Sequence, residues 1–188
     1  MDKKHIDKIR QSVKTIEIDQ KSVDKYLRIQ DTLMNTDVSK DKVFQKSFKG
    51  FYRIRRNDDW CKIYFKLLEQ QKTSQKSFSE LLRIIFNETG RVEASFTSKL
   101  VATIATDCPI WDSFVLKNLG ISSPTYLKAD KKIEAVIEKY NELTSCLHEL
   151  SELAEIKDAL KQFDINIKRS KEISTTKKID FILWSIRS

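Results

Sequence analysis

The stretch SFSELLRIIFNETG, residues 77–90, decides the fold class of this chain. Ser77 followed by Glu80 is the capping-box pattern that opens a helix, and Gly90 is a residue typical of helix ends. Between them the apolar residues recur at intervals of three and four, as on one face of a helix. They are Phe78, Leu81, Leu82, Ile85 and Phe86. The segment therefore predicts an amphipathic helix whose start and end are both visible in the sequence.

The same periodicity continues on both sides of this segment. It predicts helices over 3–34 (one long helix or two joined ones), 43–50, 58–68, 95–105, 112–120, 124–147, 150–163 and 174–186. Ser123 and Pro124 fit the N-cap and the first position of the helix that starts there. Residues 51–57 are either a short extended piece or the end of a helix. Trp60 and Trp184 have apolar neighbours at helical spacing, which assigns both to the core.

Glycine and proline are scarce, with three and two residues respectively among 188. All-β and Rossmann-type folds need turn residues or phosphate-binding glycines, so the composition argues against both. We expect an all-α fold, a single multi-helix globular domain over 1–188 with roughly eight to ten helices. The helices within 1–36 either pack on this domain or form an arm that contacts another subunit.

Positive charge is concentrated in one part of the chain. The net charge is +8, and residues 40–76 contain 11 basic and 4 acidic residues, a net charge of +7. Clustered Lys and Arg attract phosphate polyanions, although a solvated helix surface has the same composition. Within this stretch Tyr52, Arg53, Arg55 and Arg56 interleave aromatic and guanidinium groups, which suits base stacking and phosphate contacts. The alternative is a buried aromatic pair with arginines that face solvent.

Signatures of metal, cofactor and membrane binding are missing from the sequence. Cys61, Cys108 and Cys146 are widely spaced, and the two histidines do not supply the close ligand pairs of a zinc site. We expect no metal and no organic cofactor. No apolar run approaches the length of a transmembrane helix, so we expect no membrane partner. The N-terminus is charged and lacks the apolar core of a signal peptide, so we expect a cytoplasmic protein with reduced thiols.

The segment ASFTSKLVATIATDCPIWDSFVLKNLG, residues 94–120, has the clearest chemical pattern. It predicts a short helix, a tight turn at Pro109 and a second helix capped by Asp112. This segment resembles the helix-hairpin-helix DNA glycosylase superfamily. Residues 95–102 correspond to its G-x-G-x-K-x-A hairpin, with Ser95 and Thr97 in place of glycines, and residues 109–115 correspond to its P-V-D segment. The resemblance implies a helix-hairpin-helix-like central part of the fold.

By this resemblance Lys99 is the nucleophile that attacks the sugar carbon as a damaged base departs, and Asp112 is the supporting carboxylate. A partly desolvated lysine amine loses proton affinity, which frees it for attack. Trp111 beside Asp112 either lines a pocket for an extruded base or belongs to the core. From the residues alone, Lys99 is equally a surface lysine and Asp112 an ordinary helix N-cap.

Two functions of different classes are consistent with these patterns. The first is a DNA-binding protein that acts as a base-excision glycosylase or lyase through Lys99 and Asp112. The second is a non-catalytic helical protein, which binds nucleic acid through 40–76 or a protein partner through 133–163. Residues 133–163 are acidic and amphipathic, so they form either a hairpin within the domain or a partner surface. We expect a nucleic-acid partner, DNA before RNA.

Overall fold

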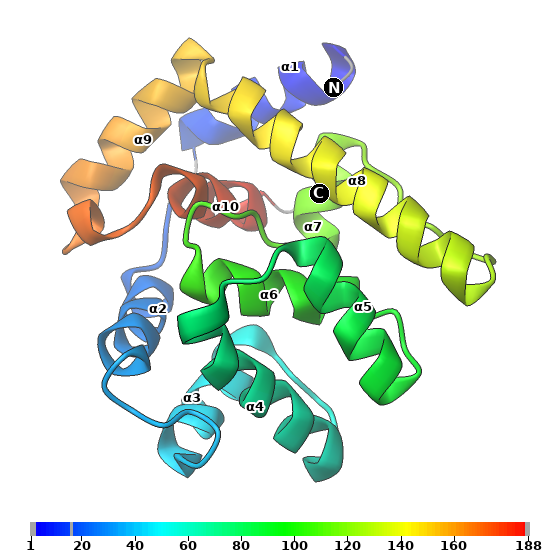
Figure 1. The fold of residues 1–188 in the computed structure, drawn as a ribbon. Helices are drawn as coiled ribbons and strands as arrows, with labels where there is room; N and C mark the ends of the chain where they lie inside the picture. Colours follow the sequence, from blue (N-terminus) through cyan, green and yellow to red (C-terminus); the bar gives the residue numbers. More distant parts are fainter. Residues whose placement is uncertain (1–2, 16, 187–188) are drawn as a thin grey trace. The chain divides into compact units, whose positions relative to one another are not determined.

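The computed structural model describes residues 3–15 and 17–186. These residues contain ten α-helices, two short 3-10 helices and no strand (Figure 1). The predicted all-α class is therefore confirmed. Among the described helices, none combines the length and the apolar character needed to cross a membrane.

The chain divides into two compact units, which are described separately. The central unit comprises residues 19–105, and the terminal unit comprises residues 1–18 and 106–188. The predicted N-terminal segment 1–36 is split between them. Helix α1 contacts α7 and the 3-10 helix η1 contacts α9 in the terminal unit, whereas α2 contacts α3 in the central unit. The predictions of a single domain and of a subunit-contacting arm stay predictions.

The central unit consists of five helices. They are α2 (Gln20–Leu33), α3 (Lys42–Tyr52), α4 (Asp58–Ser74), α5 (Phe78–Thr89) and α6 (Ala94–Ile104). The capping box predicted at the start of α5 is present, because the Ser77 hydroxyl accepts from the Glu80 N–H and the Glu80 carboxylate accepts from the Ser77 N–H. Helix α2 packs on α3, and α4 packs on α5 and α6. Each helix buries one apolar face in the common core.

Aromatic rings fill the core between α3 and α4. Phe48 is fully buried, and its ring centroid lies 4.7 Å from that of Tyr52 and 5.6 Å from that of Phe65. Phe44 and Tyr64 complete the cluster at 5.7 and 6.0 Å from Phe48. The Tyr64 hydroxyl donates to the Phe96 carbonyl at 2.9 Å, and burial raises the pKa of this phenol well above its ordinary value. The cluster fixes which side of α3 faces away from the core.

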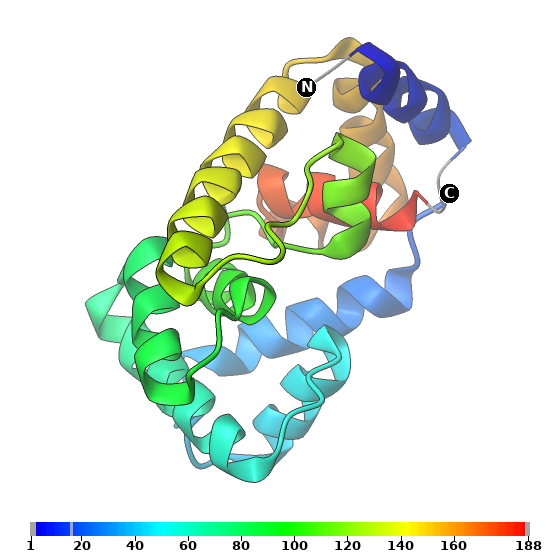
Figure 2. The ribbon, with the colours of Figure 1, turned by 90° about the vertical axis from the view of Figure 1, so that its right-hand side faces the viewer.

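The terminal unit is arranged around α10. Its helices are α1 (Lys3–Ser12), η1 (Val13–Thr15), α7 (Ser113–Leu119), α8 (Ala129–Ser151), α9 (Ala154–Asn166), η2 (Ser170–Glu172) and α10 (Thr175–Ser185). Helix α10 contacts α7, α8 and α9, and Figure 2 shows it crossing behind α7. Seven consecutive residues of α10, 177–183, are buried. The helix is therefore enclosed on all sides, including the side that carries lysines.

Ion pairs neutralise the buried lysines of α10, one with a buried carboxylate and one with a carboxylate at the surface. The Lys177 ammonium lies 2.6 Å from the Asp180 carboxylate, with side chains only 6% and 9% exposed. The Lys178 ammonium reaches Asp164 on α9, also at 2.6 Å. A buried charge is tolerated only when it is paired, so these contacts make the enclosure of α10 possible.

The structure decides two alternatives that the sequence left open, over 3–34 and 51–57, and corrects one expected helix start. The pattern over 3–34 forms two helices instead of one, because α1 ends at Ser12 and Asp19 caps a new start by accepting from the Lys21 and Ser22 N–H groups. The helix expected from Ser123 and Pro124 begins only at Ala129. Tyr126 lies in between with a φ of 58°, a left-handed conformation that interrupts a helix. Residues 51–57 combine both alternatives: α3 ends at Tyr52 and an irregular loop follows.

The predicted hairpin of 133–163 is replaced by two helices that diverge. Helices α8 and α9 meet at Glu152 and Leu153 and separate from there, as Figure 1 shows. Most of their apolar residues are buried, and both helices contact α10 of the same unit. A protein partner at residues 133–163 stays a prediction.

Replacing Gly120 with alanine is expected to destabilise the protein more than replacing Gly90. Both glycines end a helix with positive φ, 73° and 68°, so alanine is strained at each by about 1 kcal/mol. A Cβ at Gly120 would also lie 2.7 Å from the His5 ring, whereas a Cβ at Gly90 meets nothing within 4 Å. Urea unfolding of the two variants measures the difference. Equal losses would show that α1 does not approach α7 as described.

Candidate nucleic-acid interface

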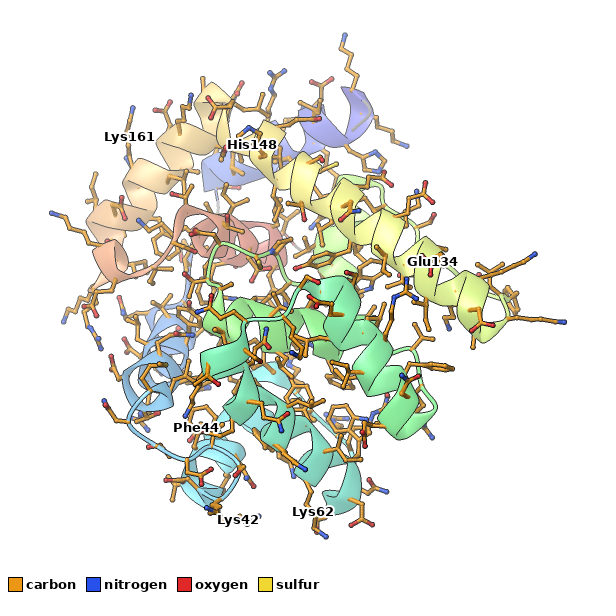
Figure 3. The ribbon with its side chains drawn as sticks, in the orientation of Figure 1. Lys42, Phe44, Lys62, Glu134, His148 and Lys161 are labelled. Carbon is orange, nitrogen blue, oxygen red and sulfur yellow. The ribbon has the colours of Figure 1, made fainter. Side chains whose placement is uncertain are left out.

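Part of the positive charge of residues 40–76 is neutralised by carboxylates of the same protein. Lys40 pairs with Asp37 at 2.8 Å, Lys62 with Asp59 at 2.9 Å, Lys72 with Glu69 at 2.7 Å and Arg56 with Glu93 at 2.6 Å. Figure 3 shows Lys62 extending outward from α4. Its hydrogen bond to Asp59 lowers the pKa of that carboxyl below its ordinary value. The net charge of this stretch therefore overstates the number of cations that can bind an external anion.

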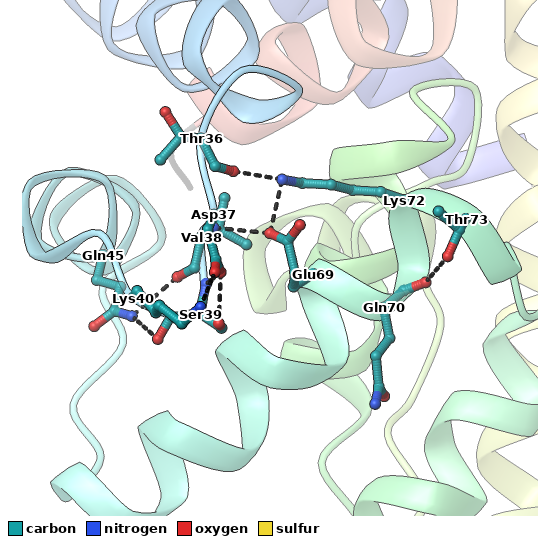
Figure 4. Close-up of polar contacts among 10 residues, drawn as sticks. All are labelled: Thr36, Asp37, Val38, Ser39, Lys40, Gln45, Glu69, Gln70, Lys72 and Thr73. Carbon is teal, nitrogen blue, oxygen red and sulfur yellow. Dashed lines mark hydrogen bonds and ion pairs between the residues drawn. The ribbon is translucent and has the colours of Figure 1, made fainter.

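Lys72 has a structural role, shown in Figure 4. Its side chain is 7% exposed and its ammonium donates to the Thr36 carbonyl at 2.5 Å while pairing with Glu69. The other contact of Glu69 is the Val38 N–H at 2.8 Å, and Gln45 donates to the Val38 carbonyl. Together these bonds fasten the loop between α2 and α3 onto α4. They fix where α3 begins.

Replacing Lys72 with methionine is expected to lower the free energy of unfolding by about 2 kcal/mol, because it leaves the half-buried Glu69 carboxylate without its cation. The matched control is Lys62→Met, which breaks an exposed pair on the same helix and is expected to cost less than about 1 kcal/mol. Urea unfolding measures both. A loss for Lys72→Met no larger than for Lys62→Met would contradict the structural role of Lys72.

The exposed side of α3 carries a line of cations. Lys42, Lys46 and Lys49 recur at intervals of four and three residues, and Arg53 follows Lys49 by four at the C-cap. We call these four residues the basic face of α3. Helix α3 itself contains no acidic residue. The aromatic residues on its other side are held in the core, and Figure 3 shows Lys42 at the outer end of the basic face. Three of its residues, Lys42, Lys46 and Arg53, are exposed, and Lys49 is partly exposed.

A pocket of about 380 Å³ is lined in part by the residues that come directly after the basic face in the sequence. Its lining includes Arg55, Arg56, Asn57, Asp59, Trp60 and Arg91, and we call it the arginine pocket. Asn57 caps α4 by accepting from the Trp60 N–H, and Gly90 ends α5 just before Arg91. The ends of two helices thus bring arginines from two distant segments to one place.

The Arg56 guanidinium is held in a defined orientation. It pairs with the nearly buried Glu93 carboxylate and lies 5.9 Å from the Trp60 ring centroid and 5.2 Å from that of Phe96. Among the described residues, the buried Nε–H of Arg56 and the Nε1–H of Trp60 have no hydrogen-bond partner. A buried donor without an acceptor is costly, which is the kind of feature found where a ligand is missing.

The structure separates the predicted nucleic-acid-binding residues into two groups. Arg53 and Arg55 are exposed and Arg56 is partly exposed. Tyr52 and Trp111 are each 6% exposed, so their rings lie in the core and have little surface to stack on a base. Arg91 and the pocket side of Trp60 were not predicted. Arg91 lies 35 residues beyond Arg56, and no local pattern signals that they meet.

The two predicted catalytic residues lie in different units of the chain. Lys99 is a buried residue of α6 in the central unit, where its ammonium donates to the Ser95 hydroxyl at 2.8 Å and lies 5.2 Å from the Phe96 ring centroid. Asp112 is the N-cap of α7 in the terminal unit and accepts from the Phe114 N–H. Ser95 and Thr97, aligned with hairpin glycines, are helical residues of α6.

The comparisons with known proteins place this chain in no family. No family model matches it, and neither the curated proteins nor the solved structures give a match. Within the described part of the chain, no cluster of three or more His, Cys, Asp or Glu side chains is arranged to hold a metal. The three cysteines are free thiols, and burial raises the pKa of Cys108. The interface described above thus rests on geometry and charge.

Proposed function

We propose that this protein binds nucleic acid through its central unit, with the basic face of α3 on the phosphates. The observation that carries the proposal is the regular line of Lys42, Lys46, Lys49 and Arg53 on one side of a helix that has no acidic residue. Cations in such a line neutralise successive phosphates and release condensed counterions. The contacts are to the backbone, so they set affinity without specifying a base sequence.

The surroundings of α3 support this proposal. Val43 is 77% exposed on the same helix, and a Cβ built on Gly50 meets nothing within 4 Å. A glycine inside a helix costs about 1 kcal/mol relative to alanine. Gly50 lies next to Lys46 and Lys49, so a ligand can approach the helix backbone closely at this point. Both features suit a surface that lies flat against a large partner.

Removing the three lysines of α3 is the test. We expect the variant Lys42→Gln with Lys46→Gln and Lys49→Gln to bind a short DNA duplex about 10- to 100-fold more weakly than the wild type. The salt dependence of log K is expected to become shallower by about 2 to 3, one counterion per lost contact. Fluorescence anisotropy with labelled duplex at several salt concentrations measures both quantities.

The matched control removes the same charge elsewhere. Lys139, Lys157 and Lys161 lie on α8 and α9 and form ion pairs with nearby carboxylates. Their triple replacement by glutamine is expected to change the affinity less than threefold, roughly the effect of net charge alone. Equal losses in the two triple variants, or no DNA binding by the wild type, would refute the proposal.

Lysine chemistry on DNA is a second candidate, implied by the glycosylase resemblance. The observation in its favour is the burial of Lys99 beside Ser95 and Phe96, since a desolvated amine is easier to use as a nucleophile. In this reaction the Lys99 amine bonds to the sugar C1′ as the base leaves with its electron pair. The attached nitrogen then loses a proton and the sugar ring opens: the C1′–O4′ bond breaks and O4′ takes up a proton. The iminium that this leaves at C1′ is the species that borohydride reduces to a stable amine.

A trapping experiment tests this candidate separately. Wild-type protein, incubated with a duplex containing an abasic site or an oxidised purine and then reduced, is expected to give a covalent protein–DNA adduct. Lys99→Gln is expected to give none. An adduct of equal yield from Lys99→Gln, or no adduct from wild-type protein that binds the duplex, would exclude Lys99 as a nucleophile.

A further inference from the structure

The arginine pocket carries more positive charge than its neighbours neutralise. Its lining has three arginines and one carboxylate, Asp59, a net charge of +2. Glu93 compensates Arg56, and Lys62 compensates Asp59, so adding these two partners leaves the net charge unchanged. In the described residues no carboxylate forms an ion pair with Arg55 or Arg91. Two guanidiniums are therefore left for an external anion.

The charge and size of the pocket define the class of that anion. A phosphate monoester carries about −1.5 to −2 at neutral pH, whereas a phosphodiester inside a strand carries a single negative charge. Guanidinium groups bind phosphate oxygens in bidentate fashion. The volume of about 380 Å³ falls in the range of about 300–1,000 Å³ for ligand pockets, which leaves room for the attached nucleoside.

The Trp60 ring lines the same pocket, together with polar groups. Trp60 is 8% exposed, and its ring lies 4.9 Å from that of Tyr64. Asp58 and Asp59 occupy the first turn of α4, so the end of this helix is not itself favourable for an anion. The Arg55 and Arg91 side of the pocket is thus where a phosphate is best stabilised. The ionised Asp59 carboxylate remains as an acceptor for sugar hydroxyl or base N–H groups.

We propose that the arginine pocket binds the phosphate monoester at the end of a nucleic-acid strand. The proposal rests on the proposed function of the central unit and adds a specific substrate feature to it. The chain leaves the basic face of α3 at Arg53 and enters the pocket lining at Arg55, so the two surfaces are contiguous. When the internal phosphates of a nucleic-acid strand lie on α3, the terminal phosphate of that strand reaches the pocket.

The experiment compares oligonucleotides that differ only in their ends. Wild-type protein is titrated with one DNA sequence carrying a 5′-phosphate, a 3′-phosphate or hydroxyls at both ends. We expect one of the phosphorylated forms to bind about tenfold more tightly than the hydroxyl form, the effect of one charge-assisted contact. The variant Arg55→Gln with Arg91→Gln is expected to lose this preference. The control Arg28→Gln with Arg83→Gln, exposed arginines of the same unit, is expected to keep it.

The α3 variant separates this inference from the proposed function. The triple lysine variant is expected to weaken binding of all three oligonucleotides while keeping the end preference. Equal affinity of phosphorylated and hydroxyl ends for the wild type would overturn the pocket assignment and leave DNA binding intact. If no oligonucleotide binds but a deoxynucleoside monophosphate binds wild-type protein and not the Arg55→Gln, Arg91→Gln variant, the proposed function and the assignment to strand ends both fail, and the pocket is a site for a free phosphate monoester. Absence of both kinds of binding would overturn both.

Discussion

Replacing Asp180 with asparagine is expected to lower the free energy of unfolding by about 3 kcal/mol. The carboxylate of Asp180 lies 2.6 Å from the Lys177 ammonium, in a pair whose side chains are 6% and 9% exposed. Removing one charge leaves the other in an environment of low dielectric, where it is poorly solvated. Urea unfolding followed by circular dichroism measures the change.

Two further variants test whether the loss comes from an unpaired buried charge. Asp158→Asn breaks a pair of the same i,i+3 spacing on α9, but its side chains are 73% exposed, so we expect a loss of less than about 0.5 kcal/mol. The double replacement Lys177→Met with Asp180→Leu removes both buried charges and is expected to recover most of the loss. A loss for Asp180→Asn as small as for Asp158→Asn would contradict the burial of α10 in the terminal unit.

Replacing Phe48 with alanine is expected to cost about 4 kcal/mol, because the side chain is fully buried and the cavity collapses only in part. Phe48 touches rings on both α3 and α4, so its loss also loosens the helix that presents the basic face. We therefore expect Phe48→Ala to weaken DNA binding although it removes no charge. Unfolding and anisotropy measurements on the same preparation check both effects.

The conservative variant Phe48→Leu keeps most of the volume and is expected to cost no more than about 1.5 kcal/mol, with DNA affinity close to that of the wild type. If Phe48→Ala unfolds at the same urea concentration as Phe48→Leu, the aromatic cluster does not anchor α3. If both variants fold and Phe48→Ala binds DNA like the wild type, the position of α3 does not control binding.

Local sequence signals predicted much of this fold. The Ser77 and Glu80 capping box and the Asp112 N-cap both form the predicted hydrogen bonds, because capping depends on residues within one turn. The pattern at Ser123 and Pro124 was misleading, since the left-handed Tyr126 delays the helix and nothing nearby in the sequence marks that conformation. The apolar residues of α10 were recognised, but not that Lys177 and Asp180 on it are buried as well.

The candidate site was only partly predictable for the same physical reason. Arg55 and Arg56 stand out as neighbours in a basic stretch. The ion-pair partner of Arg56, Glu93, and the third arginine of the pocket, Arg91, come from beyond α5. Such contacts depend on tertiary packing, which a local pattern does not encode. Charge counts also failed to distinguish Lys72, fastened inside the central unit, from Lys46 and Lys49 on the basic face of α3.

The most direct test of the account is to map where DNA covers the protein. Lysine acetylation with and without duplex DNA, read by mass spectrometry, reports the accessibility of each amine. The account predicts strong protection of Lys42, Lys46 and Lys49 by DNA and unchanged modification of Lys157 and Lys161. Protection confined to the lysines of α8 and α9, or no protection at DNA concentrations that saturate binding, would contradict the assignment of the basic face of α3 as the nucleic-acid interface.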